Sequence, residues 1–324
     1  MDAPLVRIRD LVLEAATARG TARILRGVDL DIGRGRILGV VGESGSGKSS
    51  LAACLLRLLP GNVTRLSGEV AFDGTDLLAL DPAAMAAWRG TRIAMIFQDP
   101  MTALNPVFTI GTQMVDVIRR RDPGLPRAAA LDRAETMLRR VAIADPRARL
   151  SAYPHQLSGG MRQRAMIAMA LLAGPDLLLA DEPTTALDAT VEAQIVALLE
   201  ELRSDFAGSI VLISHHLGLV AQLCDDLAVM YGGRVVETGP VAPVIAAPRH
   251  PYTRALLACE IGEGGEGRLA SIPGDVPDPV APPPGCVFAP RCPRAEARCA
   301  AEPPALRAAS EGRAAACHFF EEWS

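Results

Sequence analysis

The chain has 324 residues, a length that allows two domains or one large domain with an extension. Hydrophobic residues make up 49% of it and charged residues 22%, which is the composition of a globular protein with a sizeable core. The net charge of −4 is too balanced for a protein held mainly by nucleic-acid phosphates, so nucleic acid is not an expected partner. No apolar run reaches the roughly 20 residues of a membrane helix, and the first residues lack the apolar stretch of a signal peptide, so we expect a cytoplasmic protein.

Local patterns predict alternating strands and helices. Apolar and polar residues partly alternate over 5–13 and 24–32, a turn follows at 33–35, and residues 37–41 are apolar enough for a buried strand. A helix is expected over 50–59, ended by Pro60-Gly61. Further along the chain we expect a strand at 92–97, mostly helical structure over about 99–174, strands at 177–180 and 209–214 with a helix at 192–206 between them, and a hairpin at 227–237.

The last quarter of the chain differs from the rest. Prolines gather at 273–284, which predicts a stiff, irregular segment. We therefore expect a main domain over residues 1–240 and an extension over residues 241–324.

Residues 42–49, with the sequence GESGSGKS, fit the phosphate-loop pattern G-x-x-x-x-G-K-[ST]. The segment lies between an expected strand and an expected helix, where backbone N–H groups and the helix N-terminus attract phosphate oxygens. This context disfavours the plainer interpretation, a glycine turn with a surface lysine. We expect Lys48 to neutralise the β- and γ-phosphates and the Ser49 hydroxyl to bind Mg²⁺. The expected nucleotide contacts are Gly42, Ser44, Gly45, Gly47, Lys48, Ser49 and Ser50.

Two carboxylates follow the apolar run at 177–180. In an open α/β sheet, ligands bind at the carboxyl ends of the strands, where Asp181 and Glu182 are expected to lie. Asp181 suits Mg²⁺ and its water shell, and Glu182 suits a general base that polarises an attacking water. A strand that ends in Asp-Glu is common, so this motif is informative only together with the phosphate loop.

The segment LSGGMRQ at 157–163 predicts a second anion site. Ser158, Gly159 and Gly160 stand at the start of an expected helix, where free backbone N–H groups attract anions. Because the chain already has a phosphate loop, a second γ-phosphate site makes sense for a nucleotide held by a different subunit. The plainer alternative is a capped helix start.

These motifs, in this order, resemble the ATP-binding cassette (ABC) family over residues 1 to about 240. The resemblance implies an α/β fold with a RecA-like phosphate-loop core, an antiparallel β subdomain and a helical subdomain at about 99–174. It implies an ATPase that binds ATP and Mg²⁺ at the interface of a head-to-tail dimer.

The resemblance also assigns roles to single residues. Gln98 matches the Q-loop, which touches Mg²⁺ and the transmembrane partner, and His215 matches the switch histidine that contacts the γ-phosphate. Asp188 matches the D-loop, and Gln163 belongs to the signature motif at the neighbour's nucleotide. Taken singly, Gln98 is a surface glutamine, Asp188 a helix cap and His215 a strand-end histidine; their order favours the functional roles. The implied catalytic set is Lys48, Gln98, Glu182 and His215, and the implied Mg²⁺ set is Ser49, Gln98 and Asp181.

The sequence departs from the family pattern at two places. Family members usually carry an aromatic residue ahead of the phosphate loop that stacks on adenine, but the first aromatic here is Phe72. Arg19 or Arg23 could stack through a guanidinium plane instead. His216 stands where the family often has an aspartate.

Finer motifs resemble the ATPases of oligopeptide and dipeptide importers. They are FQDPMTALNPVFTIG at 97–111, SGGMRQR at 158–164 and HPYTR at 250–254, and the Met161-Arg162 form is similar to the D-type subunit. The resemblance implies an F-type ATPase partner in a heterodimer, two transmembrane permease subunits, a substrate-binding protein, and a peripheral location at the cytoplasmic face of the membrane. Importers of nickel chelates or of other small solutes use similar ATPases. Soluble ABC proteins of DNA repair or translation and a non-enzymatic iron–sulfur sensor are weaker alternatives.

Four of the seven cysteines lie close together near the C-terminus, at Cys286, Cys292, Cys299 and Cys317. Thiols in a cytoplasmic chain argue for metal binding rather than disulfides. Zinc sites usually have C-x₂₋₄-C spacing, which is absent here, whereas wider spacers suit a 4Fe-4S cluster. The resemblance also implies such a cluster in some relatives, so we rank the cluster ahead of zinc and both ahead of free thiols. We expect residues 285–324 to need the metal in order to fold.

Overall fold

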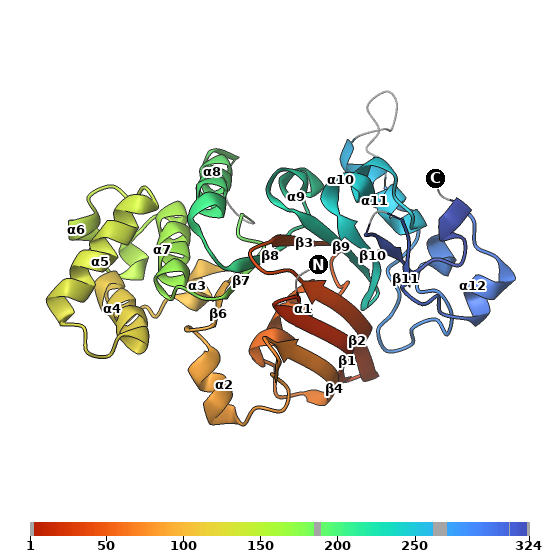
Figure 1. The fold of residues 1–324 in the computed structure, drawn as a ribbon, viewed down its shortest axis with the longest axis horizontal. Helices are drawn as coiled ribbons and strands as arrows, with labels where there is room; N and C mark the ends of the chain where they lie inside the picture. Colours follow the sequence, from red (N-terminus) through yellow and green to blue (C-terminus); the bar gives the residue numbers. More distant parts are fainter. Residues whose placement is uncertain (1–2, 185–188, 262–270, 311, 323–324) are drawn as a thin grey trace. The chain divides into compact units, whose positions relative to one another are not determined.

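The computed structural model describes residues 3–184, 189–261, 271–310 and 312–322 (Figure 1). The chain divides into two compact units. The first unit contains residues 1–80 and 212–324, and the second contains residues 81–211.

The first unit begins with an antiparallel sheet of order β2-β1-β4-β5. Its strands are β1 (Val6–Thr17), β2 (Gly20–Ile32), β4 (Val63–Phe72) and β5 (Thr75–Asp76). The predicted strands at 5–13 and 24–32 are confirmed, and both are longer than predicted. β4 was not predicted, because Val70 and Phe72 are its only fully buried side chains and the rest of the strand lacks regular alternation.

A second group of strands in the first unit has the order β11-β12-β10-β9-β3. All five residues of β3 (Ile37–Val41) are buried, and β3 runs parallel to β9 (Asp226–Tyr231). β9 forms a hairpin with β10 (Arg234–Pro240), as predicted, and Gly232 and Gly233 turn it with φ of 52° and 78°. The remaining elements of this unit are β12 (Ala314–Ala315), β11 (Arg307–Ala308), α1 (Lys48–Leu56), α9 (Leu217–Leu223), α10 (Val241–Ala246), α11 (Pro251–Ile261), α12 (Ala297–Ala301) and short 3₁₀ turns at Ala289–Arg291 and Phe320–Glu322. β8 (Ser209–Ile213) contains the boundary between the units.

The second unit is mostly helical, as predicted for residues 99–174. Its two strands, β6 (Ile93–Ile96) and β7 (Leu177–Asp181), pair in parallel. Ile110, Met114 and Ile118 recur at helical spacing on one face of α4 and are buried. The helices are α2 (Pro82–Trp88), α3 (Pro100–Ala103), α4 (Ile110–Arg121), α5 (Arg127–Arg140), α6 (Pro146–Leu150), a 3₁₀ turn at Pro154–Gln156, α7 (Gly159–Leu172) and α8 (Ala189–Asp205).

The C-terminal residues are joined to the first unit by backbone hydrogen bonds. β12 pairs with β10, with Ala315 opposite Glu237 and Ala314 opposite Thr238. The Glu237 carboxylate is fully buried and accepts hydrogen bonds from the backbone N–H groups of Arg249, at 2.7 Å, and His250, at 3.0 Å. Residues on both sides of position 240 thus belong to one compact unit. A boundary between domains at residue 240 stays a prediction. Among the described residues, no helix combines the length and the apolar character needed to cross a bilayer.

Candidate functional site: a phosphate loop and its surroundings

The predicted phosphate loop lies between β3 and α1, so the strand–loop–helix context is confirmed. Gly42, Gly45 and Gly47 have φ of 148°, 79° and 102°, values that favour glycine. A Cβ atom at Gly42 would collide with the carbonyl of Met230, and one at Gly47 would lie 2.9 Å from the Leu25 side chain. The loop therefore needs its glycines both for its turns and for close packing.

Lys48 lies inside this loop. Its side chain is only 6% exposed, and its Nζ atom donates to the carbonyls of Gly42, at 2.7 Å, and Glu43, at 3.1 Å. The ammonium group is thus held at the centre of a ring of backbone groups, the position from which a lysine meets phosphate oxygens. Ser44, Gly45 and Ser49 are exposed beside it, and Ser50 is half-buried.

A residue from the C-terminal region holds the loop in place. Arg291, whose side chain is 4% exposed, forms two hydrogen bonds with the Glu43 carboxylate, at 2.6 and 3.1 Å, and a third with the Tyr231 hydroxyl at 3.1 Å. The Glu43 carboxylate raises the pKa of Arg291. The backbone N–H of Glu43 donates to the Tyr252 hydroxyl at 2.7 Å. The sequence alone does not predict this contact, because the ion pair joins residues 248 positions apart.

We expect Arg291→Ala to lower the free energy of unfolding by about 2–3 kcal/mol, because the Glu43 carboxylate loses its partner in a partly buried place. Denaturant unfolding measures this loss. Arg294→Ala is the matched control: it removes an exposed ion pair with Glu322, and we expect a change below about 0.5 kcal/mol. The double variant Glu43→Gln/Arg291→Ala should recover part of the loss. If Arg291→Ala and Arg294→Ala lower the free energy of unfolding equally, the buried ion pair of Arg291 with Glu43 does not have the stabilising role assigned to it.

In the second unit, two predicted catalytic residues lie together. Gln98 follows β6 and Glu182 follows β7, and because these strands are parallel their carboxyl ends share one edge. The Gln98 Nε2 atom donates to the Glu182 Oε2 atom at 3.1 Å. Glu182 has φ of 47°, a left-handed conformation that is uncommon for a residue other than glycine. Asp181, the last residue of β7, is 6% exposed.

The predicted second anion site is a helix start in the second unit. The Ser158 hydroxyl accepts a hydrogen bond from the Met161 N–H at 3.3 Å and caps α7, whose first residues are Gly159 and Gly160. Gly159 is exposed with open space where a Cβ would stand, whereas a Cβ at Gly160 would lie 2.8 Å from Val191. Gln163 is 2% exposed and donates to the carbonyl of Pro183 at 2.6 Å, so its side chain ties α7 to the segment after Glu182.

His215 and Asp188 complete the predicted set. His215 is exposed just after β8, and its ring contacts the ring of His216 with centroids 4.2 Å apart. The N–H of the preceding residue, Ser214, donates to the carbonyl of Val40 in β3 at 3.1 Å, so the chain segment that carries His215 leaves beside the strand that carries the phosphate loop. Asp188 lies outside the described residues.

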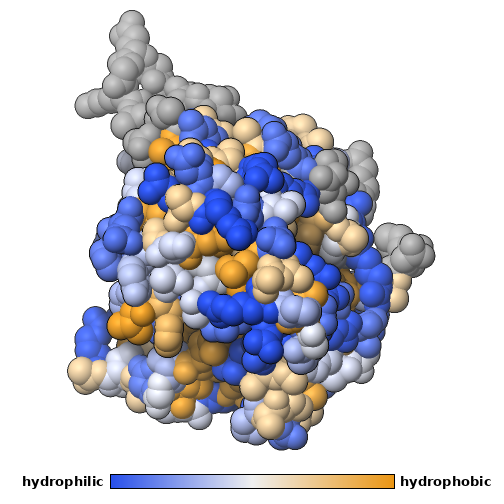
Figure 2. Space-filling model, turned by 90° about the vertical axis from the view of Figure 1, so that its left-hand side faces the viewer, coloured by the Kyte–Doolittle hydropathy of each residue, from blue (hydrophilic) through white to orange (hydrophobic). Residues whose placement is uncertain are grey.

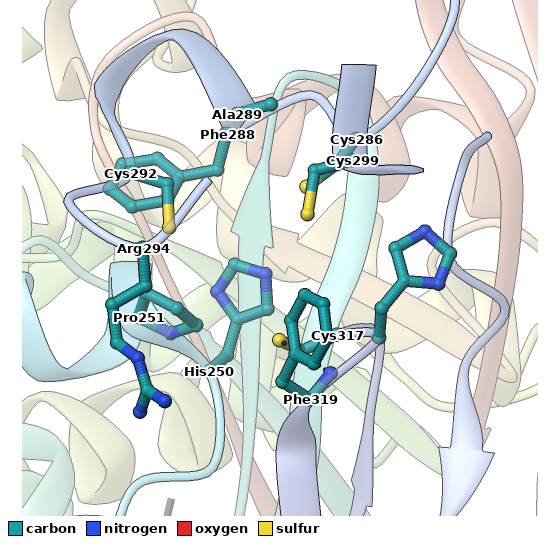
Figure 3. Close-up of a pocket in the computed structure, with 11 residues that line it drawn as sticks. His250, Pro251, Cys286, Phe288, Ala289, Cys292, Arg294, Cys299, Cys317 and Phe319 are labelled. Atoms are coloured by element: carbon teal, nitrogen blue, oxygen red, sulfur yellow. Dashed lines mark hydrogen bonds between the residues drawn. The ribbon is translucent and has the colours of Figure 1, made fainter. Parts of the chain in front are cut away.

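The four C-terminal cysteines line one pocket, a small cavity of about 20 Å³ that is also lined by His250 and His318. In Figure 3 the side chains of Cys286 and Cys299 enter it from above, Cys292 from the side and Cys317 from below, with the His250 ring among them. Burial raises the pKa of Cys286 to about 11 and also raises that of Cys292, and it lowers the pKa of His250 to about 3.

The expected metal-binding module is not shown by this geometry. Among the described residues, no group of three or more histidine, cysteine, aspartate or glutamate side chains is placed so that it could hold a metal ion. None of these four cysteines forms a disulfide in the described part of the chain, and their thiols are distributed around the pocket rather than converging on one point.

Comparisons with known proteins agree with these observations. The family profile described as "ABC transporter" matches residues 25–185, and the one described as "Oligopeptide/dipeptide transporter, C-terminal region" matches residues 236–299. The chain is 48% identical to the "Probable peptide ABC transporter ATP-binding protein y4tR" of Sinorhizobium fredii, over 97% of this chain and 94% of that protein. It is 46% identical to the "Dipeptide transport ATP-binding protein DppD" of Escherichia coli, over 94% of this chain and 92% of that protein.

Solved structures give the same result for the fold. The dimeric post-hydrolysis structure of the ATP-binding cassette MJ0796, bound to ADP and Pi, matches with a TM-score of 0.65 and 26% identity, over 73% of this chain and 98% of that one. The predicted α/β nucleotide-binding fold is therefore confirmed. The chain belongs to the ABC transporter family, and it carries the C-terminal region of the oligopeptide/dipeptide transporters.

Proposed function

We propose that this chain is the ATP-hydrolysing subunit of a peptide-class importer and couples ATP binding and hydrolysis to translocation by membrane partners. The observation that carries the proposal is its likeness, at 46–48% identity over nearly its whole length, to proteins named for peptide and dipeptide transport. The likeness extends beyond the cassette into the C-terminal region, which a general ABC ATPase lacks.

The residues of the phosphate loop bind the triphosphate in this proposal. Lys48 exchanges its loop carbonyls for the β- and γ-phosphate oxygens, and the exposed backbone at Ser44 and Gly45 supplies N–H donors. Ser49, Gln98 and Asp181 are the proposed ligands of Mg²⁺, which neutralises phosphate charge when it is bound.

Hydrolysis depends on a base and its positioning. Glu182 accepts the proton of the attacking water, and the amide of Gln98, already 3.1 Å from it, orients the carboxylate. His215 contacts the γ-phosphate. Ser158, Gly159 and Gly160 serve the nucleotide of the neighbouring subunit; the exposed N-terminus of α7 supports this role. Gln163 and Asp188 are proposed to support the same interface.

The proposed partners are an F-type ATPase subunit, two permease subunits and, through them, a substrate-binding protein, at the cytoplasmic face of the membrane. Figure 2 views the side on which α4, α5 and α6 lie in Figure 1, and hydrophobic spots are scattered there among hydrophilic residues. The second unit exposes large apolar side chains in and after the Gln98 loop: Phe97, Met101, Val107 and Phe108, with Val107 69% exposed. Such side chains suit a docking surface for short helices of the permeases.

Reconstitution tests the function. The chain is co-expressed with its permeases and ATPase partner, placed in vesicles with the binding protein, and assayed for uptake of a labelled dipeptide and of a nickel chelate. Uptake of the dipeptide that depends on ATP supports peptide import. Uptake of the nickel chelate and not of the dipeptide would show that the substrate is not a peptide. The assignment of the chain as the ATPase subunit would still hold.

We also propose that Cys286, Cys292, Cys299 and Cys317 hold a 4Fe-4S cluster. All four thiols face one pocket, and two of them, Cys299 and Cys317, are buried. A 4Fe-4S cluster takes one thiolate on each of its four irons and so needs ligands around its perimeter, whereas a single zinc ion needs them at one centre. The distribution of the thiols around the pocket therefore supports the cluster over zinc.

Anaerobically purified protein is expected to be brown, with a broad absorption band in the blue region of the visible spectrum and about four iron atoms per chain. Cys299→Ser should lose most of this iron, because Cys299 points into the pocket. Cys54→Ser, which changes a buried thiol outside the pocket, is the control and should keep the iron. A colourless protein with one zinc per chain would contradict the cluster.

A further inference from the structure

A second pocket in the first unit opens beside the phosphate loop. Gly45, Gly47 and Ser50 form one side of it, and the cavity has a volume of about 240 Å³, just below the usual range of small-molecule sites. The opposite walls come from β2 and from a proline segment of the C-terminal region. The pocket therefore continues directly from the place where Lys48 is held.

The proline segment is fixed along β2 by several contacts. The N–H of Arg23 donates to the carbonyl of Pro279 at 2.8 Å, and the Nη2 atom of Arg26 donates to the carbonyl of Pro283 at 3.2 Å. Arg19 forms an exposed ion pair with Asp278 in the same segment. Because proline fixes its own backbone φ, this wall is stiff.

The wall shared by β2 and the phosphate loop is equally well fixed. The N–H of Gly233 donates to the carbonyl of Ser46 at 3.1 Å, and the N–H of Arg26 donates to the carbonyl of Gly233 at 2.9 Å. A Cβ at Gly47 would lie 3.2 Å from the carbonyl of Ile24. The hairpin turn between β9 and β10, β2 and the phosphate loop are thus joined by hydrogen bonds and close packing, which hold the pocket in a fixed position relative to the loop.

The lining supplies flat surfaces and donors. Arg23 and Arg26 line the pocket, and so do Pro277, Pro279 and Pro282. The Nη1 atom of Arg26 is buried and has no hydrogen-bond partner in the part of the chain that the structure describes. An acceptor on a ligand would satisfy this atom. A planar heterocycle with ring nitrogens combines such an acceptor with faces that stack on guanidinium and proline.

The lining described here contains no aromatic, carboxylate or amide side chain. Without a carboxylate or an amide, the pocket has little with which to distinguish the hydrogen-bonding edges of adenine and guanine. The N7 acceptor that an arginine can reach is present in both bases.

We propose that this pocket binds the purine base of the nucleotide whose phosphates the loop holds, with Arg23 and Pro279 as its stacking surfaces, and that it accepts adenine and guanine almost equally. The C-terminal region then replaces the aromatic residue that this chain lacks. Arg19 is the weaker of the two candidate arginines, because it pairs with Asp278 and does not line the pocket. The proposal rests on the nucleotide-binding function proposed above.

Binding of ATP, GTP and inorganic tripolyphosphate to the full chain tests it. Arg23→Ala and Pro279→Ala each remove one stacking surface. Each is expected to weaken the binding of ATP about tenfold and to leave the binding of tripolyphosphate unchanged. Arg9→Ala, which removes an exposed ion pair with Asp31 on the neighbouring strand, is the control and should change neither ligand. In the unaltered chain, ATP and GTP should bind within about fivefold of each other, because the lining described here offers no side chain that separates their edges.

The ligands separate failure of this inference from failure of the phosphate site. Unchanged ATP affinity in both variants, or an equal loss for tripolyphosphate, would overturn the base pocket and leave the loop intact. If GTP binds 100-fold more weakly than ATP, the inference that the pocket does not distinguish adenine from guanine is wrong. If the unaltered chain binds neither ATP nor tripolyphosphate, the phosphate-loop assignment itself is wrong, and the base pocket fails with it.

Discussion

Glu182→Gln is expected to lower the rate of ATP hydrolysis by about 10²–10⁴-fold while ATP still binds, because glutamine keeps the shape of the side chain but cannot accept the proton of water. The amide oxygen of the new side chain can still accept the hydrogen bond that Gln98 donates to Glu182. The loop geometry is therefore retained and only the proton acceptor is lost. Phosphate release measures hydrolysis, and equilibrium binding measures ATP affinity.

The same variant should accumulate as a closed dimer with ATP, since hydrolysis is the step that resets it. Size-exclusion chromatography with the partner ATPase subunit measures this state. Glu201→Gln, on the exposed surface of α8, is the control and should hydrolyse ATP normally. Normal turnover by Glu182→Gln would refute its role as the base.

Lys48→Ala should weaken ATP binding by about 100-fold or more, because the triphosphate loses charge-assisted hydrogen bonds worth about 1.5–3 kcal/mol each. Lys48→Arg should not restore binding although it keeps the charge. The Lys48 side chain is 6% exposed and its Nζ atom lies between two loop carbonyls, a space that fits a compact ammonium and not a planar guanidinium. Calorimetry with ATP measures both variants.

Arg34→Ala is the control for Lys48, since it removes an exposed cation in the same unit that pairs with Asp73. Normal ATP affinity in Lys48→Arg would show that the enclosed geometry is not what binds the phosphates. Lys48 is the only lysine in the chain, so lysine-specific labelling of side chains, with and without ATP, reports on this loop alone.

Predictions from the sequence succeeded where a few neighbouring residues impose a local geometry. The glycines around Lys48 predicted the loop because only glycine takes the positive φ found at Gly45 and Gly47. The resemblance placed Gln98 and Glu182 in one catalytic set, and the structure joins the two side chains at 3.1 Å, just after the parallel strands β6 and β7. β4 was missed because half-exposed strands carry little hydrophobic alternation.

Contacts between distant segments were not predictable in this way. The ion pair of Arg291 with Glu43 and the proline wall beside Arg23 depend on how the C-terminal region folds back on the first unit. Neither contact has a sequence pattern, because each joins single residues that are far apart in the chain. The two candidate stacking arginines were equivalent in sequence. The tertiary structure separates them, because Arg19 pairs with Asp278 whereas Arg23 lines the pocket.

The sequence by itself determined the phosphate loop, the carboxylates that follow β7 and the helix start at Ser158, since in each the chemistry and the backbone shape come from adjacent residues. Only the tertiary structure decided which residues support them: a buried arginine from the C-terminal region for Glu43, and a pocket beside the phosphate loop whose described lining contains no aromatic side chain. The physical reason is that hydrogen bonds and packing act over a few ångströms in space, whatever the separation along the chain.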